Sequence, residues 1–302
     1  MIIDAHSHWL PQEIIYNSHF FHKAWGDIET QLKMMDEMGL DKAVLSYPTS
    51  DAHLKLGGIK ELSNIYNNNL ARIFKRYPDR FIGACILPID EPEEMLKELR
   101  RCLDLGFRAI SLASSYDGRY LDEPMFLPIY KYAQENNLPI FVHSQIVNPI
   151  GAERVRDPLL TPVIEYVFDI TICLGKLLMS GILADYQVNF IFAYFGGVAL
   201  HLADRFDVTY KMLRQINFVK DLGGLPTDFL RNIYVDTSGD KEKTNFLSAL
   251  NLLGADHILW GSDWPAKKEI RDSMAAVENL EISSVEKQGI LGENLEKILK
   301  GV

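Results

Sequence analysis

Four side chains of types that bind divalent metals stand at the ends of predicted strands. A short apolar segment runs directly into His6 and His8, and because side chains alternate along a strand, both imidazoles project to the same side. His143 ends a second apolar segment, and Asp263 follows a third. Three neutral imidazoles leave a zinc-class ion positive enough to acidify bound water, while a carboxylate can bind the ion and accept the proton. If the fold brings them together, these residues predict a metal centre that activates water or polarises a small substrate.

The alternation of strands and helices predicts an α/β fold, a closed (β/α)8 TIM barrel in one domain. Eight short and continuously apolar segments, typical of strands covered on both faces, are separated by amphipathic helical segments. The predicted strands are residues 2–5, 42–46, 81–87, 107–112, 139–143, 188–193, 232–236 and 257–261. An open doubly wound sheet is the alternative. In a barrel the carboxyl ends of the strands converge on one mouth, so the four candidate ligands would meet there.

Composition excludes several classes of function. The 302 residues include 41 acidic and 31 basic side chains, a net charge of −10, and no Lys/Arg cluster that could follow a phosphate backbone, so nucleic-acid binding is disfavoured. Apolar runs such as residues 188–195 are far shorter than the roughly twenty residues of a membrane-spanning helix. No secretory signal is apparent, and three widely spaced cysteines without a Cys-x-x-Cys pattern indicate reduced thiols. We therefore expect a cytoplasmic protein with a small-molecule substrate.

Taken in chain order, a set of local motifs resembles the amidohydrolase superfamily, in the amidohydrolase-related branch that includes aminocarboxymuconate-semialdehyde decarboxylase. The motifs are Ile-Asp-Ala-His-Ser-His at 3–8, Gly-Phe-Arg-Ala-Ile at 106–110, Tyr-Leu-Asp-Glu-Pro at 120–124 with Phe126, Phe-Val-His at 141–143, Ser-Gly at 180–181, Gly-Gly at 196–197 and Gly-Ser-Asp-Trp-Pro at 261–265. The resemblance covers nearly the whole chain and implies a single TIM-barrel domain over residues 1–302.

The resemblance also implies a metal shell. The ligands of the family correspond to His6, His8, His143 and Asp263. No lysine ends the fourth predicted strand, where binuclear relatives carry a bridging carboxylated lysine, so we expect one divalent ion: zinc first, with manganese or iron as alternatives. Relatives often form dimers, and we expect a homodimer here.

One position departs from the family pattern. Where relatives read Ala-His-x-Gly-Gly after the sixth strand, this chain reads Ala-Tyr-Phe-Gly-Gly at 193–197, so that Tyr194 replaces the histidine. A phenol with a pKa near 10 is a poor base at neutral pH. Tyr194 could donate a hydrogen bond to a developing oxyanion, bind the metal as phenolate, or mark a barrel that has lost its chemistry. His201 lies about two helical turns further on and is not expected to substitute.

Several loop residues are candidates for contacting the substrate. The loop of residues 9–26 is rich in aromatic side chains, beginning with Trp9, and His53 lies in the next loop. Together they suggest a lid over a flat substrate, although packing of the loop on the barrel would explain the aromatic residues equally well. Arg154 and Arg156 could clamp a substrate carboxylate, or be solvated. Trp264, beside a predicted ligand, could form a wall of the pocket.

The motifs predict an enzyme without fixing the reaction. The first hypothesis is a hydrolase that cleaves a C–N or C–O bond through a metal-bound water, with Asp263 and Tyr194 as the catalytic side chains and Asp263 moving the proton to the leaving group. The alternative on the same metal shell is nonoxidative decarboxylation, with Asp263 protonating the carbon that loses carbon dioxide. A third hypothesis, from another class, is a binding barrel that kept its ligands and lost turnover with the histidine.

Overall fold

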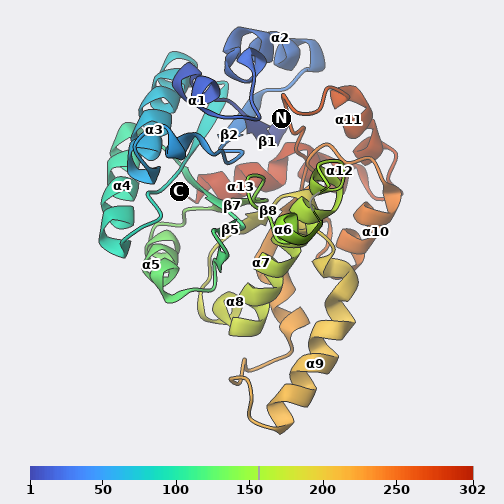
Figure 1. Cartoon of the computed structure of the whole chain (residues 1–302). Coiled ribbons are helices and arrows are strands. Elements are labelled where there is room, and N and C mark those ends of the chain that lie inside the picture. Colours follow the sequence, from blue (N-terminus) through green and yellow to red (C-terminus); the bar gives the residue numbers. More distant parts are fainter. Residues whose placement is uncertain (156, 302) are drawn as a thin grey trace.

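Eight parallel strands form a barrel, as predicted. The computed structural model describes residues 1–155 and 157–301, and the strands follow the order β1-β2-β3-β4-β7-β8-β9-β10 around the sheet (Figure 1). The strands are β1 (Ile3–His8), β2 (Lys42–Ser46), β3 (Phe81–Cys85), β4 (Ala109–Ala113), β7 (Ile140–His143), β8 (Phe190–Phe192), β9 (Ile233–Asp236) and β10 (Ile258–Leu259). Each overlaps one predicted strand.

The segment that follows β10 closes the barrel against β1. The amide of Ala5 donates to the carbonyl of Trp260 over 2.9 Å, and the amide of Asp263 donates to the carbonyl of His6 over 2.8 Å. The chains approach so closely that a Cβ atom at Gly261 would lie 2.4 Å from the Cβ of His6. Only glycine fits this crossing, which places Asp263 beside the two histidines of β1.

Helices cover the outside of the barrel. The longer helices are α2 (Ile28–Met38), α3 (Ile59–Arg76), α4 (Pro92–Leu105), α5 (Leu127–Glu135), α7 (Tyr166–Ser180), α9 (Ala203–Gln215), α10 (Lys243–Leu252) and α11 (Ile270–Glu278). The shorter ones are α1 (Gln12–Asn17), α6 (Ala152–Val155), α8 (Ile182–Asp185), α12 (Ser284–Gln288) and α13 (Asn294–Lys300). No helix in the described ranges is long and apolar enough to cross a membrane.

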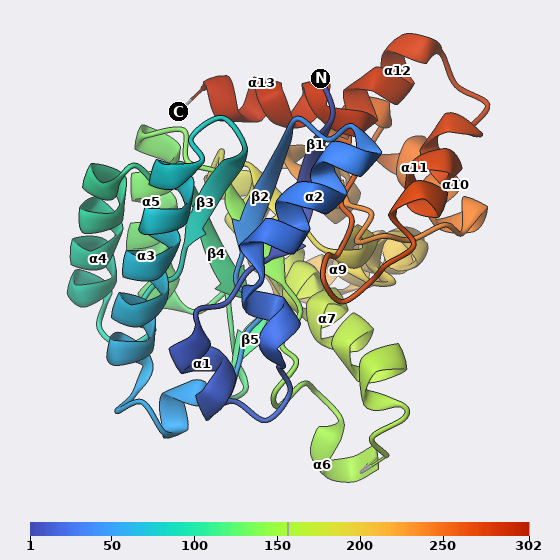
Figure 2. The ribbon, with the colours of Figure 1, turned by 90° about the horizontal axis from the view of Figure 1, so that it is seen from above.

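The barrel interior is filled with apolar side chains at its amino-terminal end. Its buried cluster takes side chains such as Val44, Phe141 and Ile191 from the strands. Leu295 and Ile298 of α13 complete the cluster, and Figure 2 shows α13 lying across the end of the barrel near the chain's N-terminus. Because this end is plugged, the polar strand ends must open at the opposite face.

Two features at that opposite face differ from the predictions. A short antiparallel hairpin, β5 (Ser115–Tyr116) and β6 (Arg119–Tyr120), follows β4 in a segment for which no element was predicted. The helical segment of residues 161–184, one of those between the predicted strands, is not a single helix. It begins at the mouth with a π-helical turn over Thr161–Glu165, and α7 ends at the other end of the barrel before Gly181, which adopts a left-handed φ of 82°. The hairpin and the π-helical turn shape the mouth of the barrel.

Candidate metal centre and adjoining pocket

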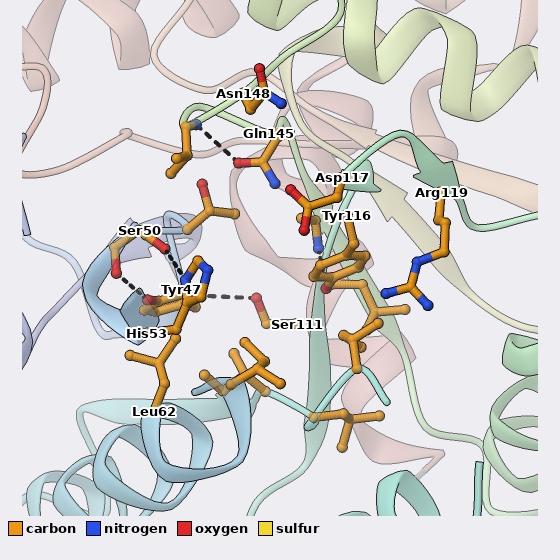
Figure 3. A pocket seen from close by; sticks show the side chains of 18 residues that line it. Tyr47, Ser50, His53, Leu62, Ser111, Tyr116, Asp117, Arg119, Gln145 and Asn148 are labelled. Atoms are coloured by element: carbon orange, nitrogen blue, oxygen red, sulfur yellow. Dashed lines mark hydrogen bonds between the residues drawn. The ribbon is translucent and has the colours of Figure 1, made fainter. Parts of the chain in front are cut away.

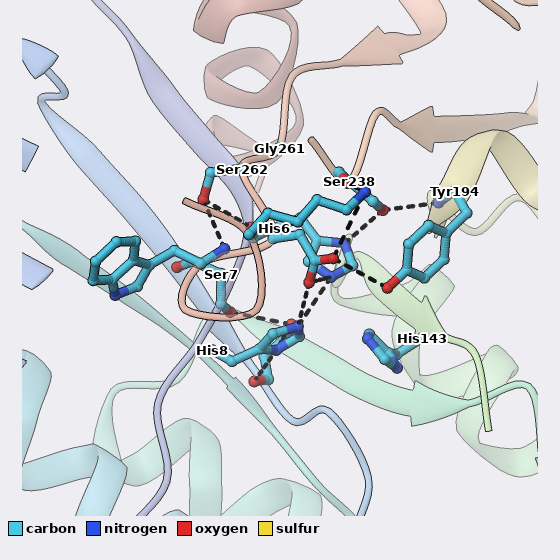
Figure 4. A network of polar contacts seen from close by, with 12 residues as sticks. His6, Ser7, His8, His143, Tyr194, Ser238, Gly261 and Ser262 are labelled. Atoms are coloured by element: carbon cyan, nitrogen blue, oxygen red, sulfur yellow. Dashed lines mark hydrogen bonds and ion pairs between the residues drawn. The ribbon is translucent and has the colours of Figure 1, made fainter. Parts of the chain in front are cut away.

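Three histidines and one aspartate meet at the mouth of the barrel. His6 and His8 belong to β1 and His143 ends β7, and their ligand atoms all lie within 4.8 Å of one another. One carboxylate oxygen of Asp263, Oδ1, lies 3.6 Å from Nε2 of His6 and 3.4 Å from Nε2 of His8. All four side chains are buried. Figure 4 shows the imidazoles of His6, His8 and His143 close together. The structure therefore brings together the four predicted ligands from distant parts of the chain.

The second nitrogen of each ring has its own hydrogen-bond acceptor. Nδ1 of His8 donates to the carbonyl of Ser46 over 3.0 Å, and Nδ1 of His143 donates to the carbonyl of Ser144 over 2.8 Å. In His6, Nδ1 lies 3.0 Å from both carboxylate oxygens of Asp236. These contacts hold the Nδ1 proton of each ring, so that Nε2 is the nitrogen each ring would turn to a metal.

The charges of the site suit a cation. The Nε2 atoms of His6 and His8 face each other across 3.0 Å, an arrangement that requires a proton or a metal ion between them. Burial would lower the pKa of His6, but the charge and hydrogen bond of Asp236 outweigh it and raise that pKa to about 9. Burial lowers the pKa of His8, and burial with the neighbouring imidazoles lowers that of His143 well below its usual value, so these two rings are neutral.

Asp263 supplies the negative charge. Burial alone would raise the pKa of its carboxyl group, but His8, His6 and Lys267 outweigh burial and lower it, so the group is ionised. Three imidazoles and one carboxylate are a donor set that zinc and manganese both accept. The residues present therefore fit one divalent ion.

Asp236 was missed by the sequence reasoning. It is the last residue of β9, it is buried, and its carboxylate also accepts hydrogen bonds from the amide and hydroxyl of Ser238, at 2.9 and 2.6 Å. A carboxylate at the end of a predicted strand was the available signal, but its partner His6 is 230 positions away in the chain. It acts on the metal site through His6.

We expect Asp236→Asn to weaken Mn²⁺ affinity about tenfold, the lower end of the effect of removing such an orienting group. The amide oxygen can still accept from His6 Nδ1, but the negative charge that makes the imidazole a stronger donor is lost. Competition with a metal-sensitive dye measures the affinity. Exposed Asp256→Asn is the control, and unchanged affinity in Asp236→Asn would contradict the role.

Tyr194 points into the same site. Its hydroxyl donates to Oδ2 of Asp263 over 3.2 Å, and its ring centroid lies 5.9 Å from that of His6 and 6.1 Å from that of His143. Burial, followed by the charges of Asp263 and Asp236, raises the pKa of the phenol well above its usual value, so it keeps its proton. His201 is exposed, in the turn after this segment.

Lys267 borders this group of side chains. Its ammonium donates to the carbonyl of Ser238 over 2.6 Å and lies 4.0 Å from Oδ2 of Asp263. The same nitrogen lies 5.6 Å from the centroid of the Tyr194 ring. Oδ2 of Asp263 therefore faces a phenol and a cation, while Oδ1 faces the imidazoles.

The predicted tryptophans are placed beside the site as buried packing groups. The indole of Trp9 is 8% exposed and donates to the carbonyl of Gly26 over 3.0 Å. Trp264 is also 8% exposed and carries the ammonium of Lys268 3.8 Å above its ring. Within the loop of residues 9–26 it is Trp25 that reaches the metal site, stacked on His8 with centroids 5.8 Å apart. Contact of Trp9 and Trp264 with substrate remains a prediction.

The predicted polar contacts lie farther out. His53 lines a pocket beside the metal centre, and its Nδ1 donates to the carbonyl of Ser50 over 3.2 Å. Arg154 is exposed in α6 and lines a separate cavity next to Asp169. Arg156 lies outside the described residues. The roles of these three side chains remain predictions.

Together, the barrel and the buried histidine–aspartate centre at its mouth define a metal-dependent TIM-barrel enzyme. The amidohydrolase family model matches residues 3–301, so the chain belongs to the amidohydrolase family. The resemblance inferred from the motifs is confirmed.

Known proteins similar to this chain include several decarboxylases. Gamma-resorcylate decarboxylase from Rhizobium radiobacter is 27% identical over 251 residues, covering 78% of this chain and 76% of that protein. 2-Amino-3-carboxymuconate-6-semialdehyde decarboxylase from Dictyostelium discoideum is 25% identical over 242 residues, covering 78% of this chain and 65% of that protein. The crystal structure of dihydroxybenzoic acid decarboxylase from a Polaromonas species contains manganese and 2-nitroresorcinol. It shares the fold with a TM-score of 0.81 and 21% identity, over 99% of this chain and 96% of that one.

Proposed function

We propose that the protein is a metal-dependent, nonoxidative decarboxylase of a small aromatic carboxylic acid. The observation that carries this proposal is the placement of Asp263, whose two oxygens face different groups: the imidazoles on one side and Tyr194 on the other. One oxygen can bind a metal while the other accepts and donates a proton. Hydrolysis was our first hypothesis, but the named relatives favour its alternative, decarboxylation.

His6, His8, His143 and Oδ1 of Asp263 would hold the ion. A bound divalent ion supplies positive charge that orients the substrate and withdraws electrons from it. The proposed ion is zinc or manganese. Zinc was the first expectation from the sequence, and manganese is present in the structure of the Polaromonas neighbour.

Asp263 would transfer the proton. In the reaction, a proton adds to the carbon that bears the carboxylate, the bond between that carbon and the carboxylate breaks, and its electron pair returns to the ring as neutral carbon dioxide leaves. Because Asp263 is ionised, it would first accept a proton from an acidic group of the bound substrate or from water, and Oδ2 would then deliver that proton to the ring carbon. Tyr194 stabilises the ionised carboxylate by donating to Oδ2, which makes protonated Asp263 a stronger acid.

The test is product analysis with metal-loaded protein. Protein reconstituted with Mn²⁺ or Zn²⁺ is incubated with 2,6-dihydroxybenzoate and salicylate in D₂O, and with esters, lactones and amides of similar size. We expect carbon dioxide release with one deuterium at the vacated carbon, abolished by chelation and restored by metal. Hydrolysis of the esters, lactones or amides without any decarboxylation would return the assignment to a hydrolase. Metal binding without turnover of any compound would favour the binding barrel.

The expected homodimer remains a prediction. Sedimentation velocity of the metal-loaded protein measures the mass against the 34.4 kDa of one chain.

A further inference from the structure

A second pocket lies beside the metal centre. None of the four candidate ligands lines it. Its walls come from the ends of β2, β3, β4 and β7 and from the β5–β6 hairpin (Figure 3). Ala113 lines the pocket and pairs in register with His143, and neighbouring strands lie about 4.8 Å apart. Tyr47, another lining residue, directly follows Ser46, whose carbonyl accepts from His8. The pocket and the metal centre therefore share a wall.

The inner part of this pocket is apolar and has the size of one ring. Leu62, Ile86 and Leu112 are buried side chains that line it. Its volume is about 210 Å³, compared with roughly 150 Å³ for an engineered apolar cavity that binds benzene. The pocket as a whole has room for a substituted six-membered ring.

The outer rim of the pocket carries one strong positive charge. Arg119 is the single arginine or lysine among the residues that line it, and it belongs to the β5–β6 hairpin. It is exposed, and no carboxylate in the described chain lies within ion-pair distance of it. One of its terminal nitrogens, Nη1, donates a hydrogen bond to Sδ of Met125 over 3.7 Å. Asp117, in the turn of the same hairpin, also lines the rim. Figure 3 shows both side chains bordering the pocket.

We propose that this pocket holds the part of the substrate remote from the metal, and that Arg119 binds a second anionic group on it. An unpaired guanidinium can bind a carboxylate through two parallel hydrogen bonds. The substrate class is a monocyclic acid with a second acidic substituent, one carboxylate at the metal and the other at Arg119. This inference rests on the proposed function and makes Arg119 a specificity-determining residue.

The test compares two ligands of nearly equal size. Isothermal titration calorimetry measures binding of isophthalate and of 3-methylbenzoate to the Mn²⁺-loaded protein. We expect isophthalate to bind about tenfold more tightly, since hydrogen bonds between charged groups are worth about 1.5 kcal/mol or more. Arg119→Gln should reduce the ratio to near one by weakening isophthalate alone. Asp117→Asn should strengthen isophthalate binding about twofold, because it removes a like charge from the rim.

Arg108→Gln is the matched control. Arg108 is exposed before β4, at the opposite end of the barrel, so its replacement changes the net charge equally without touching the pocket. Equal affinity of the two ligands, failure of both to bind, or a ratio that Arg119→Gln leaves unchanged would overturn the inference. The ratio of the two affinities does not depend on turnover. If the ratio is as expected but no acid is decarboxylated, the proposed function is wrong and the assignment of the pocket stands.

Discussion

Asp263→Asn is expected to lower kcat for decarboxylation by about 10³-fold while the protein keeps its metal. General acid–base catalysis by one positioned side chain contributes about 10²–10⁴-fold, and an amide cannot carry the proton. The amide oxygen can still occupy the position of Oδ1, 3.4 Å from Nε2 of His8, and the three imidazoles remain. Metal analysis alongside kcat separates loss of the proton donor from loss of the ion.

The matched control for this variant is Asp256→Asn. Asp256 is an exposed aspartate just before β10, so its replacement removes the same charge near the same strand without reaching the mouth. We expect wild-type kcat in the control. A value of kcat near wild type in metal-loaded Asp263→Asn would remove Asp263 as the proton donor.

The fold and the ligand set could be predicted because short segments of the sequence indicate both. Most of the buried strands are short apolar runs, and each ligand stands at or near a strand end, so the convergence of strand ends on one mouth supplied the geometry. No long-range contact had to be guessed to nominate His143 or Asp263.

The partners of those ligands could not be predicted, since they depend on pairings between distant segments. Asp236 of β9 meets His6 of β1 past the intervening strand β10, and Trp25 stacks on His8 from a loop whose path no strand pattern fixes. The β5–β6 hairpin was missed because each of its strands has only two residues, too few to show an alternating pattern. These are the elements that tune the metal and shape the pocket.

The side chains around Tyr194, which replaces the family histidine, indicate its role better than its residue type does. Three roles were open from the sequence: hydrogen-bond donor, phenolate ligand and sign of lost chemistry. A fully protonated phenol that donates to Asp263 favours the first, with the carboxylate as its partner in place of a substrate oxyanion. We therefore propose that Tyr194 is a positioning residue for Asp263.

Tyr194→Phe is expected to lower kcat about 30-fold and leave KM and metal content nearly unchanged. The variant keeps the ring that packs between the imidazoles and Lys267 and removes one hydrogen bond to a buried charged group, worth about 2 kcal/mol. Tyr234→Phe, which alters a tyrosine stacked on His257, is the control. Tyr194→His tests the alternative that the tyrosine marks lost chemistry. If wild type is active and Tyr194→His is not, the chain has adapted its site around the phenol. If Tyr194→His instead gains activity from an inactive wild type, the tyrosine marks lost chemistry and the positioning role is wrong.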